Sequence, residues 1–482
     1  MKRLDRKGMA QWLTGAQEGA SVYLVGVAGC GMSGLAHLLL DAGFAVYGSD
    51  LCENAGVCQL RDRGAEIFIG HAPEQLRTAR PDLVVYSSAI RTDNPELTVA
   101  AQQGLPIVRR AVLLAALTHL RRSICIAGMH GKTTTTALLA YALEVLGTEP
   151  GFAVGALAQQ LGRHARGGAA GSFFVVETDE SDGTLREFQP HQSIVLNIDE
   201  EHLDFYSNFE AVCDEFSTFA EQTSDTVFFC ADDLRLAVLY RAQSAAITFG
   251  FDSTADYRAE IQPDHSFVVW NGETHLGEFN IRLYGEKNIS NALAAIAFLH
   301  HNGFAAEEIC EALAGFRGVE RRQQEIFYDD RFRVFDDYGH HPREITSTLQ
   351  AIKKQCAGRL LVAFQPHRYS RTQYLLSQFA ESFGDAALLW VTEVYAASET
   401  PIADVNGQRL TTAINNQGQA AVYVESLEVL RKKVYAALQP GDVVVFLGAG
   451  DITRVAHELS GDLKLFKHEG ANTSRSVACS AE

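Results

Sequence analysis

Short hydrophobic runs alternate with longer amphipathic stretches along the N-terminal part of the chain. Strands are predicted where apolar residues run together, at 22–25, 45–47, 83–86 and 107–108. Residues 32–42 have the pattern of a helix. A second helix is framed by Asn94, which can cap it, Pro95, which can begin it, and Gly104, which can close it. Strands and helices that alternate in this way predict βαβ units with a parallel sheet.

The alternation restarts twice, which indicates three α/β domains. The second cycle has strands at 123–127, 173–176 and 194–197, with a helix at 134–146, and the third has strands at 332–335, 360–364, 388–391 and 443–447. The expected domains are residues 1–118, 119–320 and 321–467. From His468 the chain is rich in Ser, Asn, Gly and Ala without apolar periodicity, so residues 468–482 are expected to be disordered.

The composition is that of a folded enzyme. Of 482 residues, 47% are hydrophobic and 21% are charged, and the net charge of −18 disfavours nucleic acid and anionic membranes as partners. The longest apolar run, at 111–117, is too short to span a bilayer, so a cytoplasmic protein is expected. The nine cysteines lack the spacing of a zinc site and are expected to be reduced core thiols, with Cys30 a small buried filler.

A glycine loop follows the first predicted strand. Gly26, Gly29, Gly31 and Gly34 permit a tight turn whose amides point at a phosphate, and Asp50 ends the next strand, where a ribose-binding carboxylate would lie. The pattern indicates a bound diphosphate and is compatible with a nicotinamide dehydrogenase. A tight turn that binds nothing is the alternative.

A second loop, between the strand at 123–127 and the helix at 134–146, carries the strongest signal. Gly128 and Gly131 allow a ring of amides around phosphates, Lys132 can reach the outer phosphates, and Thr133 can ligand Mg²⁺. The spacing is not the standard one, because Ile126 occupies the position of the first glycine. A nucleotide-switched binding module would share this loop, and would hydrolyse ATP without an amino acid.

Acidic and polar residues follow several further strands. The run 177–182 and the run 197–202 could hold a hard cation, although a solvated acidic loop and a structural His202 are the simpler alternatives. In the third domain the segments 336–342, 365–371 and 448–451 each follow a strand. They are expected to place polar groups along one edge of one sheet.

These motifs, in this order, resemble the Mur ligases of peptidoglycan synthesis. The similar segments cover nearly the whole chain: the glycine loop, 87–90, 94–96, 131–136, 177–183, 197–206, 288–295, 321–322, 336–342, 365–372, 395–397 and 448–452. The resemblance implies a Rossmann-like N-terminal domain for a UDP-sugar, a central P-loop ATPase α/β domain, and a Rossmann-like C-terminal domain that brings the amino acid.

The resemblance also implies roles for individual residues. Lys132, Glu177 and His202 would be catalytic, with Thr133, Glu177 and His202 as Mg²⁺ ligands. The other ATP contacts would be Gly128, Met129, His130, Gly131, Thr134, Asn288, Asn291, Arg322 and Asp337. The UDP-sugar contacts would be Gly26, Gly29, Gly31, Met32, Ser33, Gly34, Asp50, His71, Ser87 and Ser88. The acceptor or the incoming amino acid would lie near His341, Arg368 and Arg371.

Four residues depart from the family pattern. Met129 replaces Thr, Glu201 replaces Asp, Lys287 replaces His and Gln323 replaces Phe. The loop amides at Met129 are kept, whereas Lys287 and Gln323 leave open how adenine is packed. Related ligases carry a carbamylated lysine after the metal histidine, but no lysine lies between positions 199 and 227, so no carbamylation is expected.

The activity that the resemblance implies is ATP-dependent amide formation with Mg²⁺. Its substrates would be UDP-N-acetylmuramate and L-alanine, handled by a monomer or homodimer. The alternative within the family is a ligase that adds a peptide or another amino acid to the same sugar nucleotide.

Overall fold

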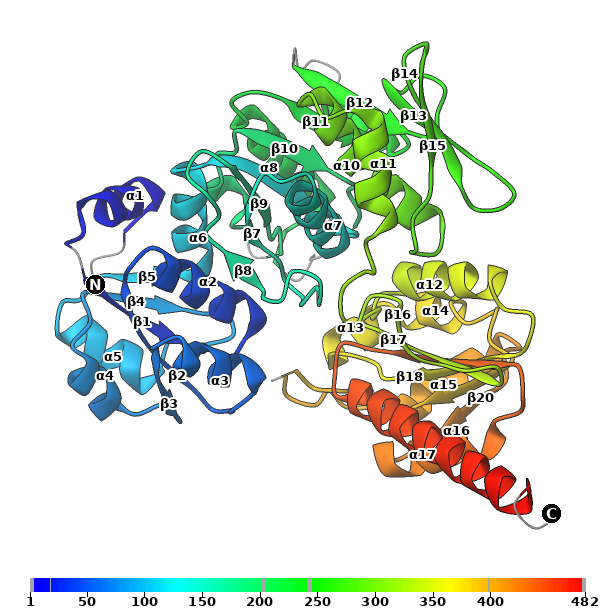
Figure 1. Ribbon diagram of the computed structural model, residues 1–482. Helices are drawn as coiled ribbons and strands as arrows, with labels where there is room; N and C mark the ends of the chain where they lie inside the picture. Colours follow the sequence, from blue (N-terminus) through cyan, green and yellow to red (C-terminus); the bar gives the residue numbers. More distant parts are fainter. Residues whose placement is uncertain are drawn as a thin grey trace. The chain divides into compact units, whose positions relative to one another are not determined.

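The computed structural model describes residues 4–17, 19–181, 183–200, 205–240, 245–397 and 399–478, with side chains as far as Leu465 (Figure 1). The chain forms two compact units. The first comprises Met1–Arg282 and Asn288–Val319, and the second comprises Leu283–Lys287 and Glu320–Glu482. The first unit contains two sheets and the second contains one.

The N-terminal sheet is fully parallel, as the alternating pattern predicted. Its strands are β1 (Ser21–Val25), β2 (Ala45–Asp50), β3 (Glu66–Ile69), β4 (Leu83–Tyr86) and β5 (Ile107–Arg109), in the order β3-β2-β1-β4-β5. The order reverses between β1 and β4, and open α/β sheets bind ligands at such a switch point. The glycine loop follows β1 at this place.

Helices surround the N-terminal sheet (Figure 1). They are α1 (Arg6–Gly15), α2 (Cys30–Asp41), α3 (Ala55–Asp62), α4 (Pro73–Ala79), α5 (Pro95–Gln102) and α6 (Arg110–His119). Leu76 of α4 and Leu97 of α5 pack with Tyr23 and Val84 on one face of the sheet. The predicted cap of α5 is confirmed, because the Asn94 side chain accepts from the amides of Glu96 and Leu97.

The central sheet has ten strands in the order β15-β14-β13-β12-β11-β10-β6-β9-β7-β8. These are β6 (Arg122–Ala127), β7 (Gly151–Ala153), β8 (Ala165–Arg166), β9 (Phe173–Glu177), β10 (Gln192–Val195), β11 (Val227–Cys230), β12 (Ala246–Gly250), β13 (Tyr257–Ile261), β14 (Phe267–Asn271) and β15 (Thr274–Phe279). Its helices are α7 (Lys132–Val145), α8 (Phe209–Glu221), α9 (Leu234–Tyr240), α10 (Glu286–His301) and α11 (Ala306–Ala314), with a 3₁₀ turn at Leu185–Glu187. Strand β6 lies between β10 and β9, so the loops after these three strands share one edge.

The C-terminal sheet has the order β16-β17-β21-β18-β19-β20 and is parallel except for β16. The strands are β16 (Gln324–Tyr328), β17 (Phe332–Asp337), β18 (Leu360–Phe364), β19 (Leu388–Val391), β20 (Ala421–Tyr423) and β21 (Asp442–Leu447). The helices are α12 (Pro342–Lys354), α13 (Tyr369–Tyr374), α14 (Leu376–Ala380), α15 (Gly407–Asn416), α16 (Leu427–Ala437) and α17 (Ile452–Ala478).

Side chains that alternate along the C-terminal strands build two cores. Val443 and Val445 of β21 face a cluster with Leu349 of α12. Val444 of the same strand faces the opposite cluster, with Leu459 of α17. Strands that are apolar on both faces give the continuous hydrophobic runs seen in the sequence.

The backbone of α17 is helical from Ile452 to Ala478, and the expectation that residues 468–482 are disordered stays a prediction. One expectation needs correction. None of the eight described cysteines forms a disulfide bond, but Cys30, Cys52 and Cys58 are exposed, so the prediction of core thiols is wrong for these three. Cys30 is the first residue of α2.

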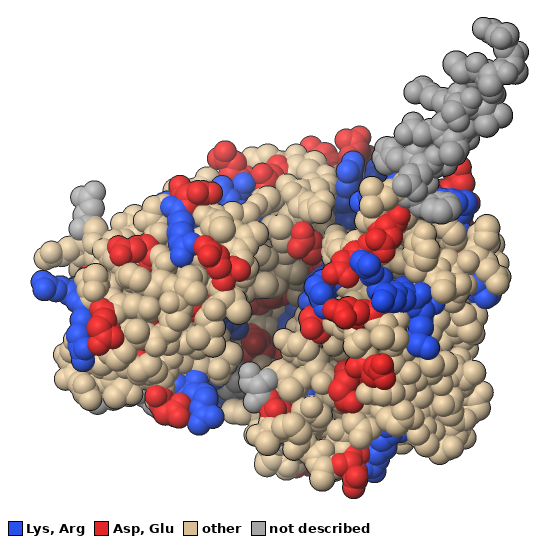
Figure 2. Space-filling model, turned by 90° about the horizontal axis from the view of Figure 1, so that it is seen from below, with Lys and Arg blue, Asp and Glu red and all other residues tan. Residues whose placement is uncertain are grey.

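Acidic and basic residues are intermingled on the face seen in Figure 2. Within the part of the chain that the structure describes, no helix has both the length and the hydropathy needed to cross a bilayer.

Candidate active site

The glycine loop is tied to the end of β2. The amides of Gly26 and Val27 donate to the Ser49 carbonyl at 2.8 and 3.1 Å, and the amide of Ala28 donates to Asp50 Oδ2 at 2.9 Å. Gly26 has a φ of +86°, which favours glycine. Asp50, predicted as a ribose ligand, therefore also braces the loop itself.

The start of α2 continues the loop toward the central sheet. The amides of the first helical turn have no partner within the helix and can face an anion. Met32 and Ser33 are almost fully buried, so their side chains belong to the core. A Cβ at Gly31 would lie 2.6 Å from Nη1 of Arg110, and one at Gly34 would lie 3.4 Å from Ala165. The two glycines thus allow close packing, and Arg110 lies directly over the loop.

Asn197, two residues after β10, clamps the phosphate loop. Its Oδ1 accepts from the amide of His130 at 2.8 Å, and its Nδ2 donates to the His130 carbonyl at 2.9 Å. Gly128 has a φ of +136° and Gly131 one of +87°, which gives the loop a conformation that residues with side chains rarely adopt. The loop is therefore shaped by glycines and by an asparagine that follows a neighbouring strand.

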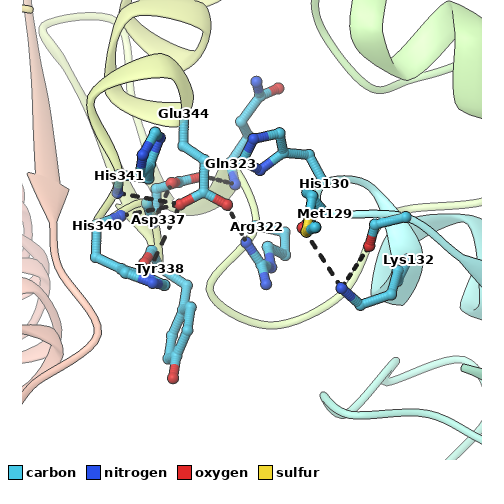
Figure 3. A network of polar contacts seen from close by, with 12 residues as sticks. Met129, His130, Lys132, Arg322, Gln323, Asp337, Tyr338, His340, His341 and Glu344 are labelled. Atoms are coloured by element: carbon cyan, nitrogen blue, oxygen red, sulfur yellow. Dashed lines mark hydrogen bonds and ion pairs between the residues drawn. The ribbon is translucent and has the colours of Figure 1, made fainter. Parts of the chain in front are cut away.

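Lys132 is the first residue of α7 and is bound within the loop. Its Nζ donates to the carbonyl of Gly128 at 2.5 Å and to Oε1 of Glu180 at 2.7 Å (Figure 3 shows its approach to Met129). Burial alone would lower the pKa of the Lys132 ammonium, but Glu180 and Asp179 outweigh it and raise that pKa. Burial would raise the pKa of Asp179, but Lys132 and hydrogen bonds from Ser181 hold it below its usual value. Lys132 is thus a firmly charged cation at the place where outer phosphates would lie.

Glu177 ends β9, next to β6 and the phosphate loop, as predicted. A Cβ at Gly155 would lie 1.9 Å from its Oε1, so this carboxylate packs against the main chain there. Its carboxylate and the hydroxyl of Thr133 are the oxygen donors that Mg²⁺ prefers, together with phosphate oxygens. His202 and Glu201 lie outside the described residues. Among the residues that are described, no group of three or more His, Cys, Asp or Glu could hold a metal.

Asn291 of α10 reaches the phosphate loop. A Cβ at Gly131 would lie 2.5 Å from Asn291 Oδ1. Asn291 Nδ2 donates to Asn288 Oδ1 at 3.3 Å. Thr134 is buried. The two asparagines and the loop therefore form one continuous polar surface in the first unit.

In the second unit, polar residues share the edge formed by β17, β21 and β18, as predicted. The amide of Gly448 donates to the Asp337 carbonyl at 3.1 Å, and Gln365 Nε2 donates to Asp451 Oδ1 at 2.7 Å. The Asp337 carboxylate accepts from the amides of Gln323 and Gly339, each at 2.7 Å. Burial raises the pKa of Asp337 to about 6, although Arg322 opposes the rise.

Arg322 and His341 meet at Glu344 of α12. Arg322 Nη1 lies 3.7 Å from Glu344 Oε1, while Glu344 Oε2 accepts from the amides of His340 and His341 at 3.1 and 3.3 Å (Figure 3). His341 is the N-cap residue of α12. Glu344 therefore orients two residues that were predicted to contact substrates.

Arg368 and Arg371 lie beside two histidines. Arg368 has a φ of 70° and donates its amide to the Tyr395 carbonyl at 2.8 Å, and Arg371 Nη1 lies 3.4 Å from Nδ1 of His367. Burial, with His340 and the two arginines, lowers the pKa of His367 to about 3. Burial also lowers the pKa of His340 to about 4. The histidines are neutral, so the arginines carry the positive charge of this edge.

The remaining predicted UDP-sugar contacts lie in the first unit. Ser87 and Ser88 follow β4, beside the glycine loop, and the amide of Ser87 donates to the Val25 carbonyl at 3.2 Å. His71 follows β3, and its Nδ1 lies 3.0 Å from Ser49 Oγ.

Several residues of the site were not predicted. Arg110 pairs with Asp179 at 3.5 Å, Glu180 binds Lys132, and Glu344 orients the start of α12. Glu180 lies in the acidic run 177–182, and this run was the sequence signal that could have identified it. Arg110 lies two residues after the strand predicted at 107–108, which is a weaker signal.

Comparisons with known proteins agree with this architecture. Three family models match in succession: the Mur ligase family catalytic domain over residues 21–122, the Mur ligase middle domain over 126–299, and the Mur ligase glutamate ligase domain over 319–450.

The chain is 40% identical over 458 residues to the UDP-N-acetylmuramate–L-alanine ligase of Agrobacterium fabrum, covering 92% of this chain and 97% of the relative. It is 41% identical over 448 residues to the ligase of the same name from Myxococcus xanthus, covering 91% and 94%. Among solved structures, UDP-N-acetylmuramate-alanine ligase from Thermotoga maritima is similar, with a TM-score of 0.80 and 29% identity over 92% of this chain and 99% of that chain. A murein peptide ligase from Psychrobacter arcticus is similar with a TM-score of 0.69 and 25% identity, over 92% and 98%.

Proposed function

Because this chain belongs to the Mur ligase family, we propose that it joins L-alanine to the lactyl carboxylate of UDP-N-acetylmuramate at the expense of ATP. The observation that carries the proposal is the phosphate loop, with Lys132 charged at the start of α7 and carboxylates at the ends of adjacent strands. The relatives from Agrobacterium fabrum and Myxococcus xanthus are named for this ligation, and the chain matches them over most of its length.

The reaction has two chemical steps. The carboxylate oxygen of the sugar nucleotide forms a bond to the terminal phosphorus of ATP, the bond to the ADP oxygen breaks, and an acyl phosphate results. The amine nitrogen of L-alanine then forms a bond to the acyl carbon, loses a proton, and phosphate leaves. Activation is needed because phosphate is a far better leaving group than oxide.

The residues of the phosphate loop serve the first step. Lys132 would place its ammonium at the transferred phosphoryl group, where negative charge must be stabilised. The amides of residues 128–133 would hold the phosphates, and Asn288 and Asn291 would contact the adenosine or the phosphates. The Lys132 contacts with Glu180 and the Gly128 carbonyl fix the ammonium in the loop before nucleotide binds.

Glu177, Thr133 and His202 would hold Mg²⁺. The ion, when bound, supplies neutralisation of phosphate charge. Carboxylate and hydroxyl donors at this edge support this assignment for Glu177 and Thr133.

The glycine loop would bind the UDP diphosphate. The nucleotide or the sugar beside it would contact Asp50, His71, Ser87 and Ser88. Arg322 and Asp337 would contact ATP, and His341, Arg368 and Arg371 the acceptor or the alanine carboxylate. Paired arginines suit a carboxylate because the guanidinium can form two parallel hydrogen bonds.

The test is ATP-dependent phosphate release by the purified protein with Mg²⁺ and UDP-N-acetylmuramate. L-alanine, glycine, L-serine, L-glutamate and a tripeptide are compared as acceptors, with product masses read in parallel. Release that needs the sugar nucleotide, is fastest with L-alanine and gives the alanyl adduct is the expected result. Fastest release with the tripeptide would assign the chain to the peptide-adding branch, and release without any amino acid would contradict a ligase.

A further inference from the structure

Glu96 is a buried carboxylate on which several elements of the N-terminal sheet converge. It is fully buried in the first turn of α5. Tyr23 Oη of β1 donates to its Oε1 at 2.7 Å, and Ser49 Oγ of β2 donates to its Oε2 at 2.7 Å. Nδ1 of His71, just after β3, lies 3.0 Å from the same Oε2. With its amide nitrogen turned toward Glu96, Gln75 of α4 donates to Oε1 at 2.9 Å.

This arrangement settles which ring nitrogen of His71 carries a proton. Ser49 gives its only hydroxyl proton to Glu96, and an ionised carboxylate can only accept. Nδ1 of His71 lies 3.0 Å from both Glu96 Oε2 and Ser49 Oγ, so a lone pair there would face two acceptors. Nδ1 must therefore be the donor, shared between these two oxygens. The hydrogen bond at one ring nitrogen determines the state of the other.

The other nitrogen, Nε2, faces outward. Both hydrogen bonds of the His71 ring within the described chain involve Nδ1, and the side chain retains 13% of its exposure. The ring also stands beside the glycine loop, because Ser49 binds His71 through its hydroxyl and binds the amides of Gly26 and Val27 through its carbonyl. The open nitrogen therefore belongs to the same edge as the loop amides.

The charges around the ring favour an anion at Nε2. Glu96 supplies a negative charge on the Nδ1 side. Tyr23 stays an uncharged donor, since burial and Glu96 raise the pKa of its hydroxyl. Asp50 directs its carboxylate to the amides of Ala28 and Cys52. A protonated ring between Glu96 and a ligand phosphate would be stabilised from both sides.

We propose that Glu96 is a positioning residue that holds His71 through Nδ1, so that the protonated ring donates from Nε2 to the diphosphate of the sugar nucleotide. This inference rests on the proposed function, because it takes the glycine loop as the diphosphate site. It assigns to Glu96 an effect on ligand affinity, although Glu96 touches no ligand.

The test is calorimetric binding of UDP-N-acetylmuramate, without ATP, from about pH 5.5 to about pH 8.5, the range in which histidine commonly titrates. The ligand diphosphate is a diester and exchanges no proton in this range, so the pH dependence reports the protein. Wild-type affinity is expected to be highest at the acid end, because a ring that donates from Nδ1 to Glu96 can also donate from Nε2 only when both nitrogens carry protons. In Glu96→Gln, which keeps the shape but removes the charge, affinity at the acid end should fall about tenfold, the loss of one charge-assisted hydrogen bond. The pH dependence should also shift to lower pH or vanish.

Two further variants separate positioning from structure. Tyr23→Phe removes one donor to Glu96 but leaves its charge, so it should keep the wild-type pH profile. His71→Ala should lose the profile, and adding Glu96→Gln to it should cost little more affinity, since the two residues act as a unit. Glu96→Gln with an unchanged pH profile, or additive losses in the double variant, would overturn the inference.

Ring nitrogen shifts of His71, measured by NMR on the wild-type protein, test the same point without a variant. Nδ1 should be protonated in the free protein and both nitrogens in the complex; an unprotonated Nδ1 would overturn the proposal. Absence of any binding by the wild type would instead overturn the proposed function, and this inference with it.

Discussion

His130 and Asn197 exchange two hydrogen bonds, so the middle of the phosphate loop is bound to the segment that follows β10. The amide of His130 donates to Asn197 Oδ1 at 2.8 Å, and Asn197 Nδ2 donates to the His130 carbonyl at 2.9 Å. A carboxamide carries one acceptor and one donor group, which matches both main-chain groups of one residue. The loop conformation thus depends on a residue 67 positions away in the chain.

We expect Asn197→Ala to weaken ATP binding more than it weakens the fold. Removing the side chain removes both hydrogen bonds to the His130 main chain, each worth about 0.5–1.5 kcal/mol. Asn197→Asp keeps the acceptor and loses the donor, so its loss should be intermediate. Nucleotide titration with a fluorescent ATP analogue, beside thermal unfolding, checks the order; equal ATP affinity in all three proteins would contradict it.

Gly131→Ala should abolish ATP binding while the protein still folds. The added Cβ would lie 2.5 Å from Asn291 Oδ1, and the alanine would have to adopt the backbone φ of +87° that Gly131 has. Gly147→Ala is the matched control, because Gly147 has a similar φ of +76° but nothing within 4 Å of its Cβ. Both variants bear backbone strain of about 1–3 kcal/mol. Only the first should lose affinity in an ATP titration, and equal affinity in the two variants would show that close packing at Gly131 is unimportant.

Hydrophobic runs predicted the buried parallel strands well, because a strand buried on both faces is apolar throughout. Strands β4, β18 and β19 begin and end where the pattern placed them. Strand β10 runs from Gln192 to Val195, whereas the pattern placed it at 194–197.

The antiparallel strands β13, β14 and β15 were not predicted. In β13 and β15 apolar residues alternate with polar ones, as in half-exposed strands, whereas the apolar run at 267–270 in β14 was a strand signal. Gly272, the first residue of the two-residue turn between β14 and β15, is a hairpin signal that could have revealed them.

In the candidate site, too, the sequence predicted some residues and not others. Lys132 and Glu177 were predicted from their places after strands, and both lie at the expected edge. Sequence could not show that Glu180 is the carboxylate that binds Lys132, because the path of the loop after β9 decides which of several acidic side chains points inward. Glu96 was also invisible as a functional residue, since an acidic residue in the first turn of a helix is common for electrostatic reasons alone.

The Lys132–Glu180 pair predicts separable effects on turnover and stability. Lys132→Met should reduce turnover by at least about 10²- to 10³-fold through the loss of charge at the phosphoryl group. It also leaves Glu180, which is 2% exposed, without its cation, which costs about 3–5 kcal/mol for a buried pair.

Adding Glu180→Gln to Lys132→Met should recover most of that stability but none of the turnover. Chemical unfolding and phosphate release on both variants and on Glu180→Gln alone test this. Recovered turnover in the double variant would mean that Lys132 acts only by neutralising Glu180.

His37 predicts a loss of stability in acid. It is buried in α2, and its Nδ1 lies 2.7 Å from Nη1 of Arg63, so the ring accepts from a cation and is neutral. Burial and the nearby Arg63 lower the pKa of His37 to about 4. Between about pH 6.5 and pH 4 the unfolded chain binds a proton at this position that the folded protein does not, so stability falls as pH falls through this window. Over this window the free energy of unfolding should fall by about 3 kcal/mol.

His37→Asn keeps an acceptor for Arg63 without a titrating ring. The unfolding temperature of this variant should fall less steeply with acid than that of the wild type. His119→Asn, at an exposed position, is the control and should follow the wild-type curve. Parallel curves for all three proteins between pH 6.5 and pH 4 would show that protonation of His37 does not limit stability in acid.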